Sequence, residues 1–282
     1  MNLLINILNV IFNLAVNTAF LFFLIIGFLI IQGLIIGRLE KISMKNIYSS
    51  IGYIGILATS IGVCIHETSH FVVAKIFNFK IKEIKLFRPI KGKRDGVLGY
   101  VSYSYNPNNI FHKIGLFFVG FAPLLGGILS LLLSMMIFLP HVFYNLSSQL
   151  NNILSYNIFS FNFFQNQLFL SLSLFNGLFT LGNFKSIQFW IFLFLAISIS
   201  SHMALSMEDL KGAYKGIKAI LLILFIFNFL LYIFNINIYN YIFYIYKFDA
   251  LFITFMNISI CFSILHLLLT YIIKLIISPF KR

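Results

Sequence analysis

The amino-acid sequence predicts an all-α polytopic membrane protein with about six transmembrane helices and a small β-hairpin on the cytoplasmic side. Two observations carry this prediction. Hydrophobic residues make up 60% of the 282 residues, charged residues make up only 10%, and the mean hydropathy is +0.98. Several apolar windows of about twenty residues are also long enough to cross a bilayer. Soluble globular domains do not have this composition, so we expect one membrane domain over residues 1–282.

The predicted elements follow one another along the chain, separated by polar segments. Near the N-terminus, Asn residues at helical spacing indicate an interfacial amphipathic helix over residues 2–17, and a scatter of Asn within a first span explains them equally well. Part of the nearly uncharged segment 140–186, around 167–182, is a candidate for dipping into the membrane. The expected spans cover residues 18–37 (ending at Arg38), 48–77, 112–139, 187–206, 217–236 and 250–275.

A β-hairpin is predicted over residues 79–105. Alternating residues flank the turn signal Gly92-Lys93-Arg94-Asp95-Gly96, and Asn106-Pro107-Asn108-Asn109 breaks the second strand. Two roles for the hairpin stay open at this point. Its edge could pair with an extended substrate strand, or its basic residues could hold it to anionic lipid.

The distribution of charge predicts the orientation in the membrane. The chain has a net charge of +13, and nine Lys or Arg lie between Lys75 and Lys113, whereas segment 140–186 contains only Lys185. Because basic residues concentrate in cytoplasmic loops, we expect residues 78–112, residues 207–216 and the C-terminus inside the cell and 140–186 outside. Three basic residues oppose this orientation: Arg38, Lys41 and Lys45. We therefore expect a multi-pass protein of the bacterial cell membrane whose partners include the lipid bilayer and not nucleic acid.

The sequence His66-Glu67-Thr68-Ser69-His70 lies inside the predicted span 48–77. On a helix, His66 and His70 share one face and can offer imidazole nitrogens to one metal ion. Glu67 can point toward a metal-bound water and take its proton. Ionisable groups at membrane depth are expensive and usually functional. The alternative is a pair of histidines that merely pack and form hydrogen bonds with neighbouring helices.

A third metal ligand is expected near the end of the predicted span 187–206, because a catalytic zinc ion usually has three protein ligands and one open position. Asp209 is our prediction, since a short carboxylate at a helix end can reach a neighbouring helix. The pattern Ser206-x-x-Asp209 also resembles a capping box, which would make Asp209 a helix-start signal. Spacing alone does not separate these two interpretations.

The stretch from His66 to Ala74, followed by a hairpin, a helix that contains Gly and Pro, and a later string Asp209-Leu210-Lys211-Gly212, resembles the site-2 protease family of intramembrane zinc metalloproteases. The similarity covers roughly residues 50–218, and no loop is large enough for an inserted PDZ domain, so the chain resembles the compact members. It departs from the family pattern after Asp209, where an Asp-Gly pair and flanking prolines are absent.

The resemblance implies that His66, His70 and Asp209 bind Zn²⁺ and that Glu67 activates water. It also implies a division of the membrane domain into a catalytic core, residues 48–218, and accessory membrane helices, residues 1–37 and 217–282.

The expected function is zinc-dependent intramembrane proteolysis of a transmembrane or membrane-associated protein substrate. One alternative is a membrane zincin of another family in which Glu208 is the third ligand. Another is a protein that cuts nothing, either a metal or ion transporter or a pseudoprotease. Transporters favour polar groups at the membrane midplane on several helices, whereas this chain concentrates its polar groups near one face.

Overall fold

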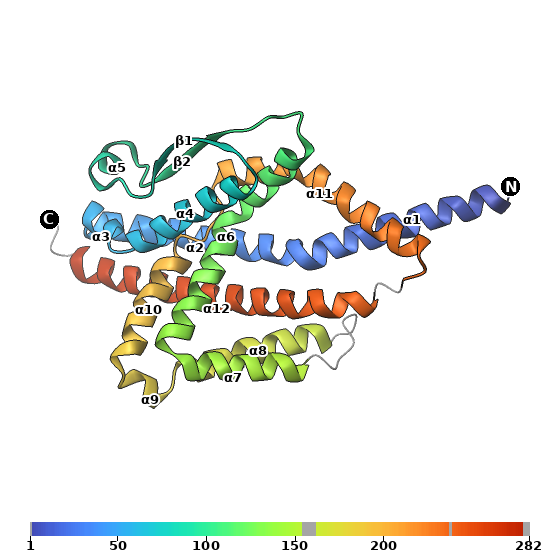
Figure 1. The fold of residues 1–282 in the computed structure, drawn as a ribbon. Helices are drawn as coiled ribbons and strands as arrows, with labels where there is room; N and C mark the ends of the chain where they lie inside the picture. The colour runs from blue at the N-terminus through green and yellow to red at the C-terminus, as the bar shows by residue number, and fades with distance from the viewer. Residues whose placement is uncertain (1, 154–161, 237–238, 279–282) are drawn as a thin grey trace.

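The computed structural model describes the 282-residue chain except residues 1, 154–161, 237–238 and 279–282 (Figure 1). The described residues are mostly helical and contain one two-stranded sheet, which confirms an all-α protein with a small hairpin. Among them, three helical segments are long and apolar enough to cross a membrane. These segments are α6 (Ile110–Phe138), α11 (Met207–Ile233) and residues Asp249–Ile277 of α12 (Tyr239–Ile277).

The N-terminal region is helical well beyond the predicted first span. Helix α1 (Asn2–Phe22) continues through a π-helical turn, η1 (Phe23–Gly27), into α2 (Phe28–Ser50). The helix therefore does not end with the predicted span 18–37 at Arg38 but continues to Ser50. No proline or glycine interrupts residues 38–50, and the helix stops only before Gly52, whose φ of 78° is a left-handed conformation that favours glycine.

The predicted span 48–77 is not one helix, because two short helices occupy most of it. Helix α3 (Tyr53–Leu57) begins after the glycine turn, and α4 (Ser60–Ile76) follows the kink at Ala58 and Thr59. The whole His-Glu-x-x-His sequence lies on α4, which confirms the helical spacing expected for the two histidines.

The predicted hairpin is confirmed, although its connection is not a simple turn. Strand β1 (Lys80–Lys85) pairs antiparallel with β2 (Tyr100–Ser104), with a register shift between Ile81 and Glu83. Between the two strands, most of the sequence expected to form a turn, Gly92 to Asp95, belongs to the short helix α5 (Pro89–Asp95). Proline suits the first position of a helix, and Gly96, with a φ of 75°, ends it.

Helices α6 and α10 (Ile187–Ser200) connect two ends of the molecule. The hairpin lies at one end of α6, and the segment that contains α7, α8 and α9 lies at the other end (Figure 1). The predicted span 187–206 is shorter than expected, since α10 stops at Ser200 and a loop leads to α11. Helices α7, α8 and α9 thus lie far from the hairpin (Figure 1), while the placement of the hairpin and residues 140–186 on opposite sides of a membrane stays a prediction. The three helices at the second end are α7 (Pro140–Ile153), α8 (Asn162–Leu178) and α9 (Leu181–Phe184).

Small residues allow the helices around the histidines to approach closely. A Cβ atom at Gly62 of α4 would collide with the backbone carbonyl of Ser198 in α10, and one at Gly120 of α6 would collide with the carbonyl of Asp209 in α11. Such contacts bring helix backbones together, which small residues generally allow in membrane helices. As a result, α4, α6, α10 and the start of α11 meet at one place.

Candidate metal centre

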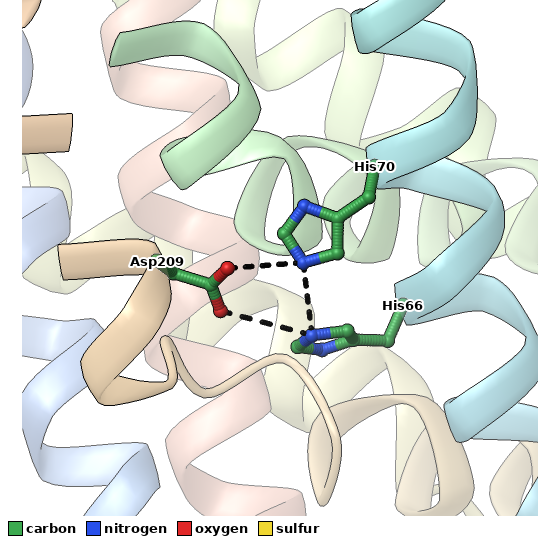
Figure 2. Close-up of side chains that lie close together, drawn as sticks. All are labelled: His66, His70 and Asp209. Atoms are coloured by element: carbon green, nitrogen blue, oxygen red, sulfur yellow. Dashed lines mark hydrogen bonds and ion pairs between the residues drawn. The ribbon is translucent and has the colours of Figure 1, made fainter. Parts of the chain in front are cut away.

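The structure brings the three predicted metal ligands together (Figure 2). His66 and His70 project from α4, and Asp209 projects from the first turn of α11. The two Nε2 atoms are 3.2 Å apart, Nε2 of His70 lies 3.1 Å from Oδ1 of Asp209, and Nε2 of His66 lies 3.8 Å from Oδ2. One donor atom from each residue therefore faces a common point, and all three lie within 4.8 Å of one another.

Backbone carbonyls orient both imidazole rings. Nδ1 of His66 donates a hydrogen bond to the carbonyl of His202 at 2.7 Å, and Nδ1 of His70 donates to the carbonyl of Val119 at 2.9 Å. A carbonyl oxygen only accepts, so this network assigns the hydrogen of each neutral ring to Nδ1. Each Nε2 then presents a lone pair to the other ring and to the carboxylate, which is the arrangement that metal-binding histidines need.

The donor set fits a zinc-like divalent ion. Two imidazole nitrogens and one carboxylate match the ligands found in catalytic zinc sites, which keep a further position open. Bonds of about 2.1 Å at tetrahedral angles would place donor atoms about 3.4 Å apart. The two Nε2 atoms are 3.2 Å apart, and Nε2 of His70 is 3.1 Å from Oδ1 of Asp209, both close to this value. The separation of 3.8 Å joins His66 to the other carboxylate oxygen, Oδ2, and one donor atom from each residue lies within 4.8 Å of the others. The cluster could therefore hold a metal ion without rearrangement of the helices.

Pro123 explains why the Val119 carbonyl is available to His70. Proline has no backbone N–H, so the carbonyl four residues earlier in a helix lacks its usual donor. Pro123 lies inside α6, and that earlier residue is Val119. The imidazole of His70 supplies the missing donor. From the sequence this proline was notable only as part of a helix that contains Gly and Pro, and its relation to the histidine was not predicted.

Replacement of Pro123 by Ala is expected to weaken metal binding by about 10-fold, because the restored N–H would compete with His70 for the Val119 carbonyl. A group that forms a hydrogen bond with a metal-binding histidine typically increases the metal affinity by about 10- to 100-fold. Competition with a chromophoric chelator measures the zinc affinity of the purified full chain. Pro140→Ala is the matched control, since Pro140 begins α7, where its missing N–H is not needed. Equal affinity in both variants would contradict this role of Pro123.

Asp209 combines the two roles that its spacing left open. The Ser206 hydroxyl accepts a hydrogen bond from the N–H of Asp209 at 3.1 Å, and the N–H of Ser206 donates to Oδ2 at 2.8 Å, which completes a capping box. The same carboxylate faces both imidazoles. The cap thus fixes the direction in which the carboxylate points. Glu208, the alternative ligand, is exposed, and no ion pair joins it to His66 or His70 in the described part of the chain.

Glu67 lies beside the three clustered ligand residues and faces the same cavity. It is 9% exposed and, together with the three ligand residues, lines a cavity of about 1060 Å³. No hydrogen bond or ion pair occupies its carboxylate within the described residues. Gly99 of the hairpin packs against it, because a Cβ atom there would collide with Cγ of Glu67. Glu67 is therefore held in place by packing, while its carboxylate remains available to water or substrate.

Two further parts of the site were not predicted. Tyr103 of β2 lines the cavity, and burial raises the pKa of its hydroxyl to about 12, with the nearby Asp209 carboxylate adding to the effect. Tyr103 therefore stays protonated and can donate a hydrogen bond. The ring of His202 lies 2.9 Å from the Thr59 hydroxyl and 3.4 Å from Glu40, which fixes the loop whose carbonyl binds His66. Neither arrangement leaves a local sequence signal, because each joins distant segments.

Comparison of the chain with protein-family models, with curated proteins and with solved structures finds no match. The resemblance to the site-2 protease family stays a prediction from the motifs. The functional argument below therefore depends on the geometry of the candidate metal centre.

Proposed function

We propose that this protein is a zinc metalloprotease that cleaves a membrane-protein substrate in the manner of the site-2 protease family. One observation carries the proposal. Two Nε2 atoms and the Asp209 carboxylate converge beside the carboxylate of Glu67 at one cavity. The described residues of the chain also include three helical segments that are apolar and long enough to cross a membrane. This combination provides metal ligands, a general base and space for a substrate.

The proposed chemistry is hydrolysis of a peptide bond. A zinc ion held by His66, His70 and Asp209 would polarise the peptide carbonyl and make water more acidic. Glu67 accepts a proton from the water that attacks the carbonyl carbon, and it then gives this proton to the departing amine nitrogen as the carbon–nitrogen bond breaks. Tyr103 supplies a neutral hydrogen-bond donor to the same cavity.

The substrate must be locally unwound before it is cut, because the amides of a transmembrane helix are bonded within the helix. The hairpin lies beside the site, with Tyr100, Val101 and Tyr103 of β2 lining the cavity. Addition of a substrate strand to the hairpin is one way to hold an extended segment. Attachment of the basic hairpin to anionic lipid is the alternative role, and both belong to the proposal.

The finer topology is also part of the proposal. We place about six spans in a bacterial cell membrane, with the hairpin and the metal centre near the cytoplasmic face and residues 140–186 on the other side. The basic residues from Lys75 to Lys113 support this orientation.

Removal and restoration of the metal test the function. The purified full chain is incubated with detergent-solubilised membrane proteins of the expression host, and mass spectrometry identifies new peptide termini. We expect termini within or close to membrane spans, their loss after treatment with EDTA and their return with about one equivalent of zinc. If a zinc-loaded protein produces no termini beyond those of a metal-free sample, the protein binds metal without proteolysis.

A further inference from the structure

A second cavity, separate from the metal centre, lies between η1, α2, α6, α11 and α12. Its volume is about 440 Å³, which is within the range of small-molecule sites in proteins. None of its lining residues lines the cavity of the metal centre. Leu, Ile and Phe side chains form its wall, and Asp249 is the one ionisable residue among them.

Asp249 is the unexplained feature of this cavity. It is only 5% exposed, and its Oδ2 atom has no hydrogen-bond partner within the part of the chain that the structure describes. No ion pair with a described Lys, Arg or His compensates it. A buried carboxyl group needs a polar partner whether or not it carries a proton, since burial without one is unfavourable. Among the described residues Oδ2 of Asp249 has no partner, and the cavity beside it has room for a ligand group that supplies one.

The remaining wall indicates what kind of ligand fits. Four phenyl rings line the cavity, from Phe117, Phe118, Phe121 and Phe252. Aromatic faces attract cations, and an ammonium group beside both phenyl rings and a carboxylate is a common recognition pattern. The apolar rest of the cavity favours a ligand whose remaining atoms are hydrocarbon.

We propose that this cavity binds an apolar molecule that carries one ammonium group, with the group directed at Asp249. A free lipophilic amine and the amine headgroup of a membrane lipid share this chemistry. The inference is independent of the proposed proteolysis, because it involves neither the metal ligands nor Glu67.

Calorimetric titration of the full chain in dodecyl maltoside, which has neither charge nor amine, tests the proposal. The probes are aminoadamantane and adamantanol, which have similar shapes and differ in charge. We expect aminoadamantane to bind at least about 10-fold more tightly than adamantanol, and Asp249→Asn to remove this preference. Asp95→Asn is the matched control, because Asp95 is exposed and pairs with Arg88 at 2.7 Å. Equal affinities of the wild type for the two probes would overturn the proposal.

Two additions complete the experiment. Leu224→Trp fills the cavity from α11 without changing its charge, so it should abolish binding of both probes even if Asp249→Asn does not fold. Addition of phosphatidylethanolamine to the micelles distinguishes the ligand sources. A weaker apparent affinity for aminoadamantane would assign the site to a lipid headgroup, and an unchanged affinity would assign it to a free amine.

Discussion

Glu67→Gln is expected to lower the rate of substrate cleavage by about 1000-fold while bound zinc stays at the wild-type level, because general acid–base groups contribute about 10²- to 10⁴-fold. Gln keeps the size of the side chain that packs against Gly99 but can neither accept nor return the proton. Glu67 is not among the three clustered ligand residues, so its replacement should not release the ion. Cleavage is followed by appearance of new peptide termini, and zinc is measured by elemental mass spectrometry.

Glu208→Gln is the matched control for this variant, since Glu208 lines the same cavity and is exposed. We expect it to retain both zinc and cleavage. Loss of zinc in Glu208→Gln would instead support a zincin with Glu208 as ligand. Full cleavage by Glu67→Gln would rule out Glu67 as the general base.

Asp209→Asn is expected to weaken zinc binding by more than about 100-fold. Loss of a group that only forms a hydrogen bond with a metal ligand already lowers the metal affinity by about 10- to 100-fold, and loss of a ligand itself should cost more. An amide binds zinc poorly compared with a carboxylate, and Asp209 supplies the only acidic group of the cluster. Zinc content after dialysis and affinity by chelator competition measure the effect. Cleavage should fall in parallel and recover in part at high zinc concentration.

Ser206→Ala separates the two roles of Asp209. This variant removes the hydroxyl that caps α11 and leaves the carboxylate in place, so we expect a loss of about 1 kcal/mol of stability with little loss of zinc. If Asp209→Asn behaves like Ser206→Ala and retains zinc and activity, Asp209 is a helix cap and not a ligand.

The parts of the structure that depend on local sequence could be predicted. The spacing of His66 and His70 placed both on one face of a helix, and alternation around a glycine-containing segment predicted the hairpin. Hydropathy also predicted helix α6 closely. In each of these cases neighbouring residues determine the structure, so a window of the sequence contains the necessary information.

The parts that depend on distant contacts were missed or left open. Hydropathy falls after Arg38, but α2 continues because backbone hydrogen bonds, and not hydrophobicity, determine where a helix ends. The carbonyl of Val119 becomes a partner of His70 only after α4 and α6 pack together. For Asp209, the local pattern predicted the cap, while its approach to the histidines depends on the close contact at Gly120.

Both sides of the junction between α10 and α11 contact the histidines: the loop through the carbonyl of His202, and the first turn of α11 through the carboxylate of Asp209. An ion at this position would crosslink α4, which carries both histidines, to the first turn of α11, which carries Asp209. Metal binding and local unfolding of the loop between α10 and α11 are thermodynamically linked. Slower amide hydrogen exchange in this loop would therefore report the bound ion even in a variant that cannot cleave substrate.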